Sequence, residues 1–168
     1  MGSTTRECDQ PWGARLVSHP SWPFLPTEAG VEVNLADHEQ EVLENLIVDL
    51  RHLLMADAHD ALRRLKPPAH PDNEEAEAAY RELVDEDMLR SRLDLLDVID
   101  HGMNGATLDE EGVGAWMQGL NMIRLVLGER LELDGADLQS HELPEGPATF
   151  LYEWTGELLE FLVRAASG

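Results

Sequence analysis

The chain is poor in cysteine, in basic residues and in long apolar runs, and each shortage excludes a class of protein. Its single cysteine, Cys8, cannot form a disulfide within the chain. No apolar run reaches the roughly 20 residues that cross a bilayer, because Arg124 interrupts the longest one. The N-terminus also lacks the basic-then-apolar pattern of a secretion signal. We therefore expect a cytoplasmic protein that does not enter a membrane.

Positive charge is scarce. Thirty-four acidic residues against twelve basic ones give a formal net charge of −22. Such a surface repels phosphate backbones and anionic membranes, which disfavours nucleic-acid binding. The tightest basic run, "RRLK" from Arg63 to Lys66, stands near Asp57 and Asp60. We interpret this run as the last turn of a short helix, where the helix dipole stabilises basic side chains, in preference to a phosphate-binding site.

The usual catalytic and cofactor motifs are missing as well. The chain has no G-x-S-x-G, no H-E-x-x-H, no phosphate-cradling glycine loop and no cysteine pair. We therefore expect no catalytic residues, no cofactor and no resident metal, and we expect a protein that is not an enzyme.

One sequence, "DLLDVIDH", is the strongest argument for a metal-dependent enzyme. Asp94, Asp97 and His101 share a helix face at spacings of three and four, so that Asp97 and His101 are able to grip a divalent ion. The competing interpretation is an exposed acidic face with His101 at a helix C-terminus. Paired E-x-x-H motifs of a dimetal bundle are absent. We interpret the remaining histidines around the second helix and the linker as surface or capping residues: His52, His59 and His70.

Length and composition favour one mainly α domain. A chain of 168 residues can bury a substantial core, and few aromatics (5%) with abundant leucine favour helices over a β-sandwich. Residues 1–30 are rich in proline and are predicted to be partly irregular. Weak period-two alternation in "ARLV" (14–17) and "VEVNL" (31–35) predicts a small N-terminal β-hairpin. Residues 31–168 are predicted to form the helical domain.

Apolar residues at helical spacing predict a bundle of about five helices. The first predicted helix begins near Asp37 and the second spans residues 58–65. Residues 73–102 follow as one helix or two. The last two predicted helices run from Thr107 to about Arg130 and from Pro147 onward. Pro67 and Pro68 must end the second helix. Thr107 and Glu110 form a capping-box pattern, and Pro147 suits a first helical turn.

The stretch "WMQGLNMIRLVLGERL" (116–131) is apolar on nearly every face, which predicts a central helix with neighbours on several sides. Trp116 and Trp154 fall on apolar stripes, which favours core packing over a pocket lining. The glycines of this helix lower its propensity, and this is tolerable where a neighbouring helix approaches closely: Gly114, Gly119 and Gly128.

A narrow polar line interrupts this predicted core helix at Asn121, Arg124 and Gly128. A buried guanidinium needs a partner or a path to solvent. One interpretation is a buried ion pair of Arg124 with Glu153 or Glu157 of the last helix. The other is a binding site in which Arg124 and Asn121 hold an anion, a peptide carboxylate or a protein partner, since arginine suits bidentate carboxylate recognition.

Three segments carry a family resemblance: "AHPDNEEAEAAYRELVDEDMLRSRLDLLDVID", "LDEEGVGAWMQGLNMIRLVLGERL" and "LYEWTGELLEFLVRAASG". They resemble an actinobacterial family of unknown function, over roughly residues 31–168. The most specific part is "AWMQGLN" leading into "RLVLGERL". Members tend to carry a polar residue before a leucine or isoleucine between Asn121 and Arg124, where this chain has Met122 and Ile123.

The resemblance implies a cytoplasmic helical protein, often encoded near the adaptor of the Clp protease and sometimes described as a transcriptional regulator. It supplies no catalytic motif. Together with the residues, it favours a non-enzymatic regulatory or adaptor-like protein that binds a protein partner, with a Clp-pathway component implied by the resemblance alone. The alternatives are a transcriptional regulator and a metal-dependent enzyme, and a homo-oligomer is left open.

Overall fold

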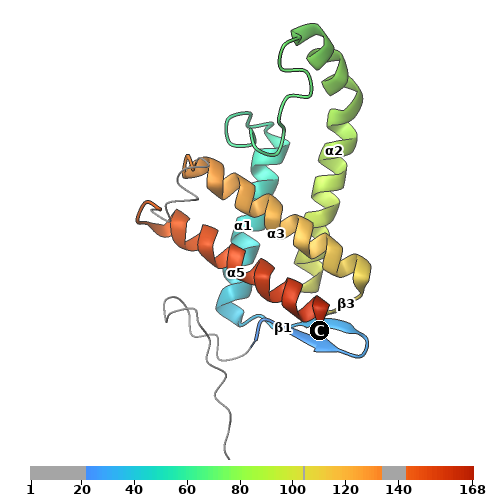
Figure 1. Cartoon of the computed structure of the whole chain (residues 1–168), viewed down its shortest axis with the longest axis vertical. Helices are drawn as coiled ribbons and strands as arrows, with labels where there is room; N and C mark the ends of the chain where they lie inside the picture. Colours follow the sequence, from blue (N-terminus) through green and yellow to red (C-terminus); the bar gives the residue numbers. More distant parts are fainter. Residues whose placement is uncertain (1–21, 104, 134–142) are drawn as a thin grey trace, which may run out of the picture.

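Four helices form the body of the described structure, a computed structural model that covers residues 22–103, 105–133 and 143–168 (Figure 1). They are α1 (Asp37–Met55), α2 (Glu74–Gly102), α3 (Glu110–Arg130) and α5 (Pro147–Ser167). The described residues therefore confirm a mainly helical fold but contain four helices rather than about five.

The predicted short helix over residues 58–65 is wrong, because this segment folds as consecutive turns. Asp57 adopts a left-handed backbone with φ of 46°, which breaks the path of the preceding helix. Only isolated turn bonds follow, such as Leu62 N to Ala58 O at 3.0 Å and Leu65 N to Leu62 O at 2.8 Å. The residues 73–102, by contrast, give one long helix rather than two.

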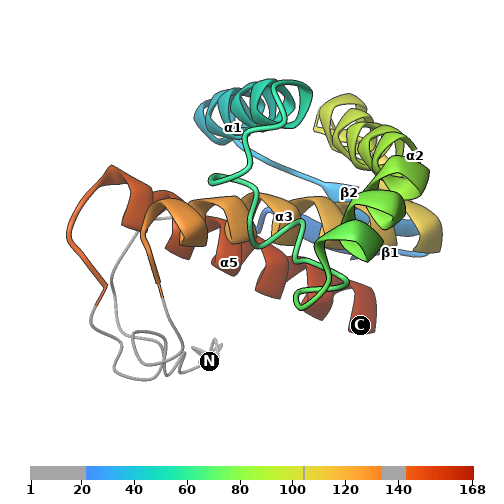
Figure 2. The same cartoon turned by 90° about the horizontal axis from the view of Figure 1, so that it is seen from above.

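α3 lies at the centre of the bundle. Figure 2 shows α1 and α2 on one side of α3, and α5 on the other side, running antiparallel to α3. The buried apolar residues of α3 cover more than one face: Trp116, Leu120 and Ile123 form one stripe, and Met122 and Val126 lie on the face beside it. The central position agrees with the prediction from its sequence.

A glycine sets the close approach of α2 to α3. A Cβ atom at Gly119 would lie 2.2 Å from Cδ1 of Ile99, a buried residue of α2. Any larger residue at position 119 would therefore collide with the neighbouring helix. This contact confirms that a glycine within α3 serves helix packing.

A small antiparallel sheet closes one end of the bundle, with the strand order β1 (Phe24–Thr27), β2 (Gly30–Val33) and β3 (Thr107–Leu108). The predicted strand over 31–35 thus exists over some of its length, while its predicted partner over 14–17 lies outside the described residues. Phe24 pairs with Val33, and Val31 pairs with Leu108. Gly30 has φ of +137° and leaves no room for a Cβ atom beside the carbonyl of Leu108.

The start of α3 differs from the predicted capping box. Thr107 is part of β3 and pairs with Glu32, so it is unavailable as a cap. Asp109 is the N-cap instead, and its carboxylate accepts a 2.8 Å hydrogen bond from the backbone N–H of Gly112. Pro147 occupies the first turn of α5, as predicted.

The two tryptophans predicted to pack in the core do so. Trp116 is fully buried and meets the ring of Phe24 edge to face at 5.6 Å between centroids, which joins the sheet to α3. Trp154 is buried on α5. Within the described ranges, no helix has the length and apolar character needed to cross a membrane.

Candidate functional site: a groove between α2 and α3

Arg124 leaves α3 towards α5, where it lies over the ring of Tyr152. The guanidinium carbon is 4.7 Å from the centre of that ring, which is a cation–π contact. The same side chain crosses α5 at Gly156, where an added Cβ would lie 3.2 Å from Nε of Arg124. Gly156 therefore provides the space in which the guanidinium rests.

The contact that the structure shows for the Arg124 guanidinium is aromatic. No salt bridge joins Arg124 to Glu153 among the described residues, and the buried Nε of Arg124 has no hydrogen-bond partner there. The half-buried guanidinium is stabilised by the face of the Tyr152 ring.

Gly128 has a similar role, one helical turn further along α3. An added Cβ there would lie 3.1 Å from Nη1 of Arg64 and 3.5 Å from the ring of Tyr152. The polar line seen in the sequence is thus resolved into separate contacts: Arg124 and Gly128 face Tyr152, and Gly128 also accommodates Arg64.

Asn121, the other predicted binding residue, is exposed and lines a groove between α2 and α3. Arg124 is not among the residues that line it. The structure therefore does not bring Asn121 and Arg124 together in one site.

This α2–α3 groove has a volume of about 570 Å³, within the range of ligand-binding clefts. Its apolar lining comes from three segments: Leu65 precedes the Pro67–Pro68 pair, Val84 and Met88 lie on α2, and Met122 lies on α3. The amides of Gln118 and Asn121 add polar groups on the α3 side. The groove thus combines an apolar surface with a few hydrogen-bonding groups.

Arg92 is the one cationic side chain in the lining of this groove. Its Nη2 donates a 2.6 Å hydrogen bond to the carbonyl of Leu65, while its buried Nη1 has no partner among the described residues. Burial lowers the pKa of Arg92, and the negative charge of Asp85 partly opposes that effect. A buried N–H without an acceptor is costly, so an oxygen atom brought by an occupant would find a donor there.

Sequence reasoning missed Arg92, although a signal existed. Position 92 falls four residues after Met88 and three before Leu95, on the same apolar stripe of α2. A charged residue at a stripe position indicates either a buried polar contact or a binding site.

The face considered as a metal site is occupied by internal contacts. Nη2 of Arg51 on α1 binds Asp97 at 2.5 Å and Asp100 at 3.1 Å. The ring nitrogen Nδ1 of His101 lies 2.7 Å from the backbone oxygen of Asp97. Among the described residues no three histidine, cysteine or carboxylate side chains are grouped so that they could hold a metal ion.

We call the turns over residues 58–65 the turn segment. The basic run over 63–66 connects this segment to two helices. Arg63 and Arg64 both pair with Glu129 of α3, whose side chain is only 8% exposed. Lys66 lies 2.6 Å from a carboxylate oxygen of Asp57 and 3.9 Å from one of Asp85 on α2. These pairs hold in place the segment that supplies Leu65 to the groove.

Two of the histidines contact the start of α2. Nε2 of His59 lies 2.7 Å from Nη1 of Arg81. The backbone N–H of His70 donates to the carboxylate of Glu77 at 2.8 Å, and its ring meets Tyr80 edge to face. The hydrogen bond from Arg81, followed by that from His70, lowers the pKa of Glu77. Both histidines are exposed, and their contacts link the chain before α2 to that helix.

Fold and groove together define a small acidic helical bundle with an apolar cleft on one side of its central helix. The chain belongs to the family described as a domain of unknown function, DUF2017, which it matches over residues 21–166. Comparison with curated proteins and with solved structures gives no match.

Proposed function

We propose that this protein is a non-enzymatic regulatory or adaptor-like protein that binds a protein partner in the α2–α3 groove. The observation that carries the proposal is the groove itself, about 570 Å³ in volume, with apolar side chains from two helices open to solvent. In folded proteins, concave apolar surfaces with a few polar groups are preferred binding sites.

The chemistry of the groove suits a polypeptide segment. Leu65, Val84 and Met88 offer apolar contacts, and methionine adapts to side chains of different shape. Gln118 and Asn121 carry amides that both donate and accept hydrogen bonds, as a peptide backbone requires. Asn121 thus keeps a binding role in the proposal, whereas Arg124 acts through the packing of α3 on α5.

Charge supports a protein partner over nucleic acid. The net charge is −22, and the basic groups of the turn segment and of α1 are paired with carboxylates: Arg51, Arg63, Arg64 and Lys66. Few free cations are left on these elements to contact a phosphate backbone. These contacts therefore give no support to the transcriptional regulator.

The family resemblance extends the proposal to the cellular location and to the identity of the partner. We place the protein in the cytoplasm of an actinobacterium and take a component of the Clp pathway as the first partner to test. This step depends on the resemblance and not on the groove.

The test is affinity capture of the tagged full chain from its own cell lysate at moderate salt. Three baits are compared: the unchanged chain, Met88→Asp in the groove, and Val163→Asp on the exposed side of α5. We expect a defined protein that the unchanged chain and Val163→Asp retain and that Met88→Asp loses. The same set of proteins on all three baits would contradict the proposal, and nucleic acid as the only specific eluate would favour the regulator.

A further inference from the structure

The α2–α3 groove continues along α2 beyond the volume described so far. A second hollow of about 280 Å³ is lined by Pro67, Pro68 and Tyr80, and it shares Leu65, Val84 and Met88 with the first. The two hollows form one surface that follows α2 from Glu77 to Leu95. We call this surface the α2 channel.

The α2 channel has the length of a helix. The span from residue 77 to residue 95 on an α-helix corresponds to about 27 Å, or roughly five turns. Its α2 wall presents Tyr80, Val84, Met88 and Leu95 at spacings of four and seven residues. This spacing is the pattern by which one helix packs against another.

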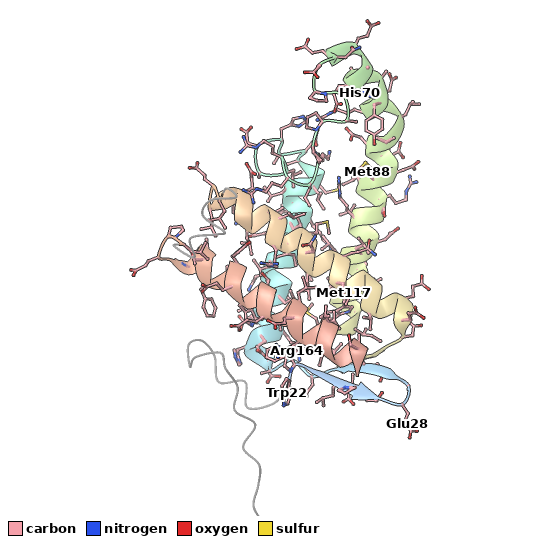
Figure 3. All side chains as sticks on the ribbon, viewed as in Figure 1. Trp22, Glu28, His70, Met88, Met117 and Arg164 are labelled. Carbon is pink, nitrogen blue, oxygen red and sulfur yellow. The ribbon has the colours of Figure 1, made fainter. Side chains whose placement is uncertain are left out.

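The first half of α2 is not covered by any other helix of the described ranges. In Figure 1 it extends beyond the ends of α1, α3 and α5, and the chain just before it lies alongside. Figure 3 labels Met88 near the middle of this long helix and His70 near its start. Tyr80, which lines the second hollow, is 39% exposed, and Leu83, which lines neither hollow, is 79% exposed. Large apolar side chains on such a helix indicate a surface that a partner covers.

The charge of the whole helix α2, and not that of the channel lining, selects the kind of helix. The lining itself is balanced, with the carboxylates of Glu77, Asp85 and Asp87 and the cations of Lys66, Arg81 and Arg92. α2 carries ten acidic residues against three arginines. Arg81 is paired with Glu77, and Arg90 is paired with Glu86 and Asp87. A second copy of this chain would bring −22 against −22, which disfavours self-association. A cationic partner is complementary in charge.

We infer that the α2 channel binds a basic amphipathic helix of a protein partner, with its apolar face on Val84 and Met88 and its lysines or arginines beside the carboxylates of α2. The inference rests on the proposed function and specifies its partner. This is the helix-in-groove mode of recognition.

The direct test uses a designed helical peptide and the full chain. The probe is a fluorescein-labelled peptide of about 18 residues with leucines along one face and lysines along its edges, long enough to span the channel. The control peptide carries glutamate at every lysine position. Fluorescence anisotropy at about 50 mM and about 300 mM salt measures the affinity of each peptide.

We expect the lysine peptide to bind, to weaken at the higher salt, and to bind much more tightly than the glutamate peptide. Met88→Asp should weaken binding at least about tenfold, although it adds negative charge, because the apolar contact is lost. Tyr80→Ser, at a partly exposed position in the lining of the second hollow, should also weaken it. Val163→Asp on α5 adds the same charge as Met88→Asp and should leave the affinity unchanged.

Three outcomes would overturn the inference: equal binding of both peptides, equal binding to the unchanged chain and Met88→Asp, or a dimer in light scattering that Met88→Asp dissolves. The last outcome would make a second copy of this chain the occupant. The lysate capture separates this failure from failure of the proposed function. A captured protein that depends on Met88, combined with a lysine peptide that does not bind, overturns the basic helix and leaves the partner-binding groove in place.

Discussion

The guanidinium carbon of Arg124 lies 4.7 Å above the ring of Tyr152, and this contact joins α3 to α5. A cation over an aromatic face contributes about 0.5–2 kcal/mol, depending on its exposure to water. Because Nε of Arg124 has no hydrogen-bond partner among the described residues, we expect the ring to contribute much of the stabilisation of this side chain.

Replacing the ring tests this contact. We expect Tyr152→Leu to lower the free energy of unfolding by about 1 kcal/mol, because it removes the aromatic face, and Tyr152→Phe to leave it nearly unchanged, because it keeps that face. Urea unfolding followed by circular dichroism measures both. Equal losses in the two variants would show that the hydroxyl matters, and not the cation–π contact.

Two glycines of α3 form a matched pair for testing helix packing. Gly119→Ala should lower the free energy of unfolding, because its Cβ would meet Ile99 at 2.2 Å and overpacking costs about 1–3 kcal/mol. At Gly114 an added Cβ would have no neighbouring atom within 4 Å, so Gly114→Ala should stabilise by up to about 1 kcal/mol through helix propensity. Thermal unfolding of both variants gives the signs. Stabilisation by both would mean that α2 moves aside without cost.

Removing the carboxylate of Glu129 should loosen the turn segment that carries Leu65. Glu129 pairs with Arg63 and Arg64 from a largely buried position. Hydrogen bonds to charged groups contribute about 1.5–3 kcal/mol, so we expect Glu129→Ala to destabilise by about that amount. Hydrogen exchange should accelerate at residues 58–66 more than in α5. Uniform acceleration over the whole chain would mean that the segment has no separate opening.

The stability of the turn segment should also depend on pH through Asp57. The hydrogen bond from Lys66 is the main cause that lowers the pKa of Asp57 below its usual 3.8. A lowered pKa in the folded state stabilises the protein above pH 3.8, and this stabilisation is lost as the pH falls below that value. Because Asp57 is largely exposed, we expect less than about 1 kcal/mol.

Asp57→Asn is the variant that isolates this charge, since asparagine also accepts the left-handed backbone of position 57. The difference in unfolding free energy between the unchanged chain and Asp57→Asn should be largest near neutral pH and vanish in acid. A difference that stays constant from neutral pH into acid would attribute the effect to packing instead of charge.

Local sequence was enough to predict most of the helices. The spacing of apolar residues and the first-turn position of Pro147 are properties of neighbouring residues, and the helices follow them. The apolar character of α3 on nearly every face likewise predicts its central position.

Contacts between distant segments overrode the local signals elsewhere. Thr107 looks like a helix cap, but pairing with Glu32 makes it part of a strand. Residues 58–65 have a helical pattern, but Asp57 turns the chain and the pairs of Arg63, Arg64 and Lys66 hold it as turns. The strand at Thr107 and the pairs of Arg63 and Arg64 with Glu129 depend on residues that lie far away in the sequence.

In the candidate site, too, one part could be predicted from the sequence and another part depends on tertiary packing. The sequence contains Asn121 and Arg124 one helical turn apart, and that spacing suggests a shared role. Only tertiary packing decides that Arg124 meets Tyr152 on α5 while Asn121 lines the α2–α3 groove. The reason is physical: helical periodicity specifies which side chains share a face, whereas the elements that cover or leave open that face depend on how the whole chain packs.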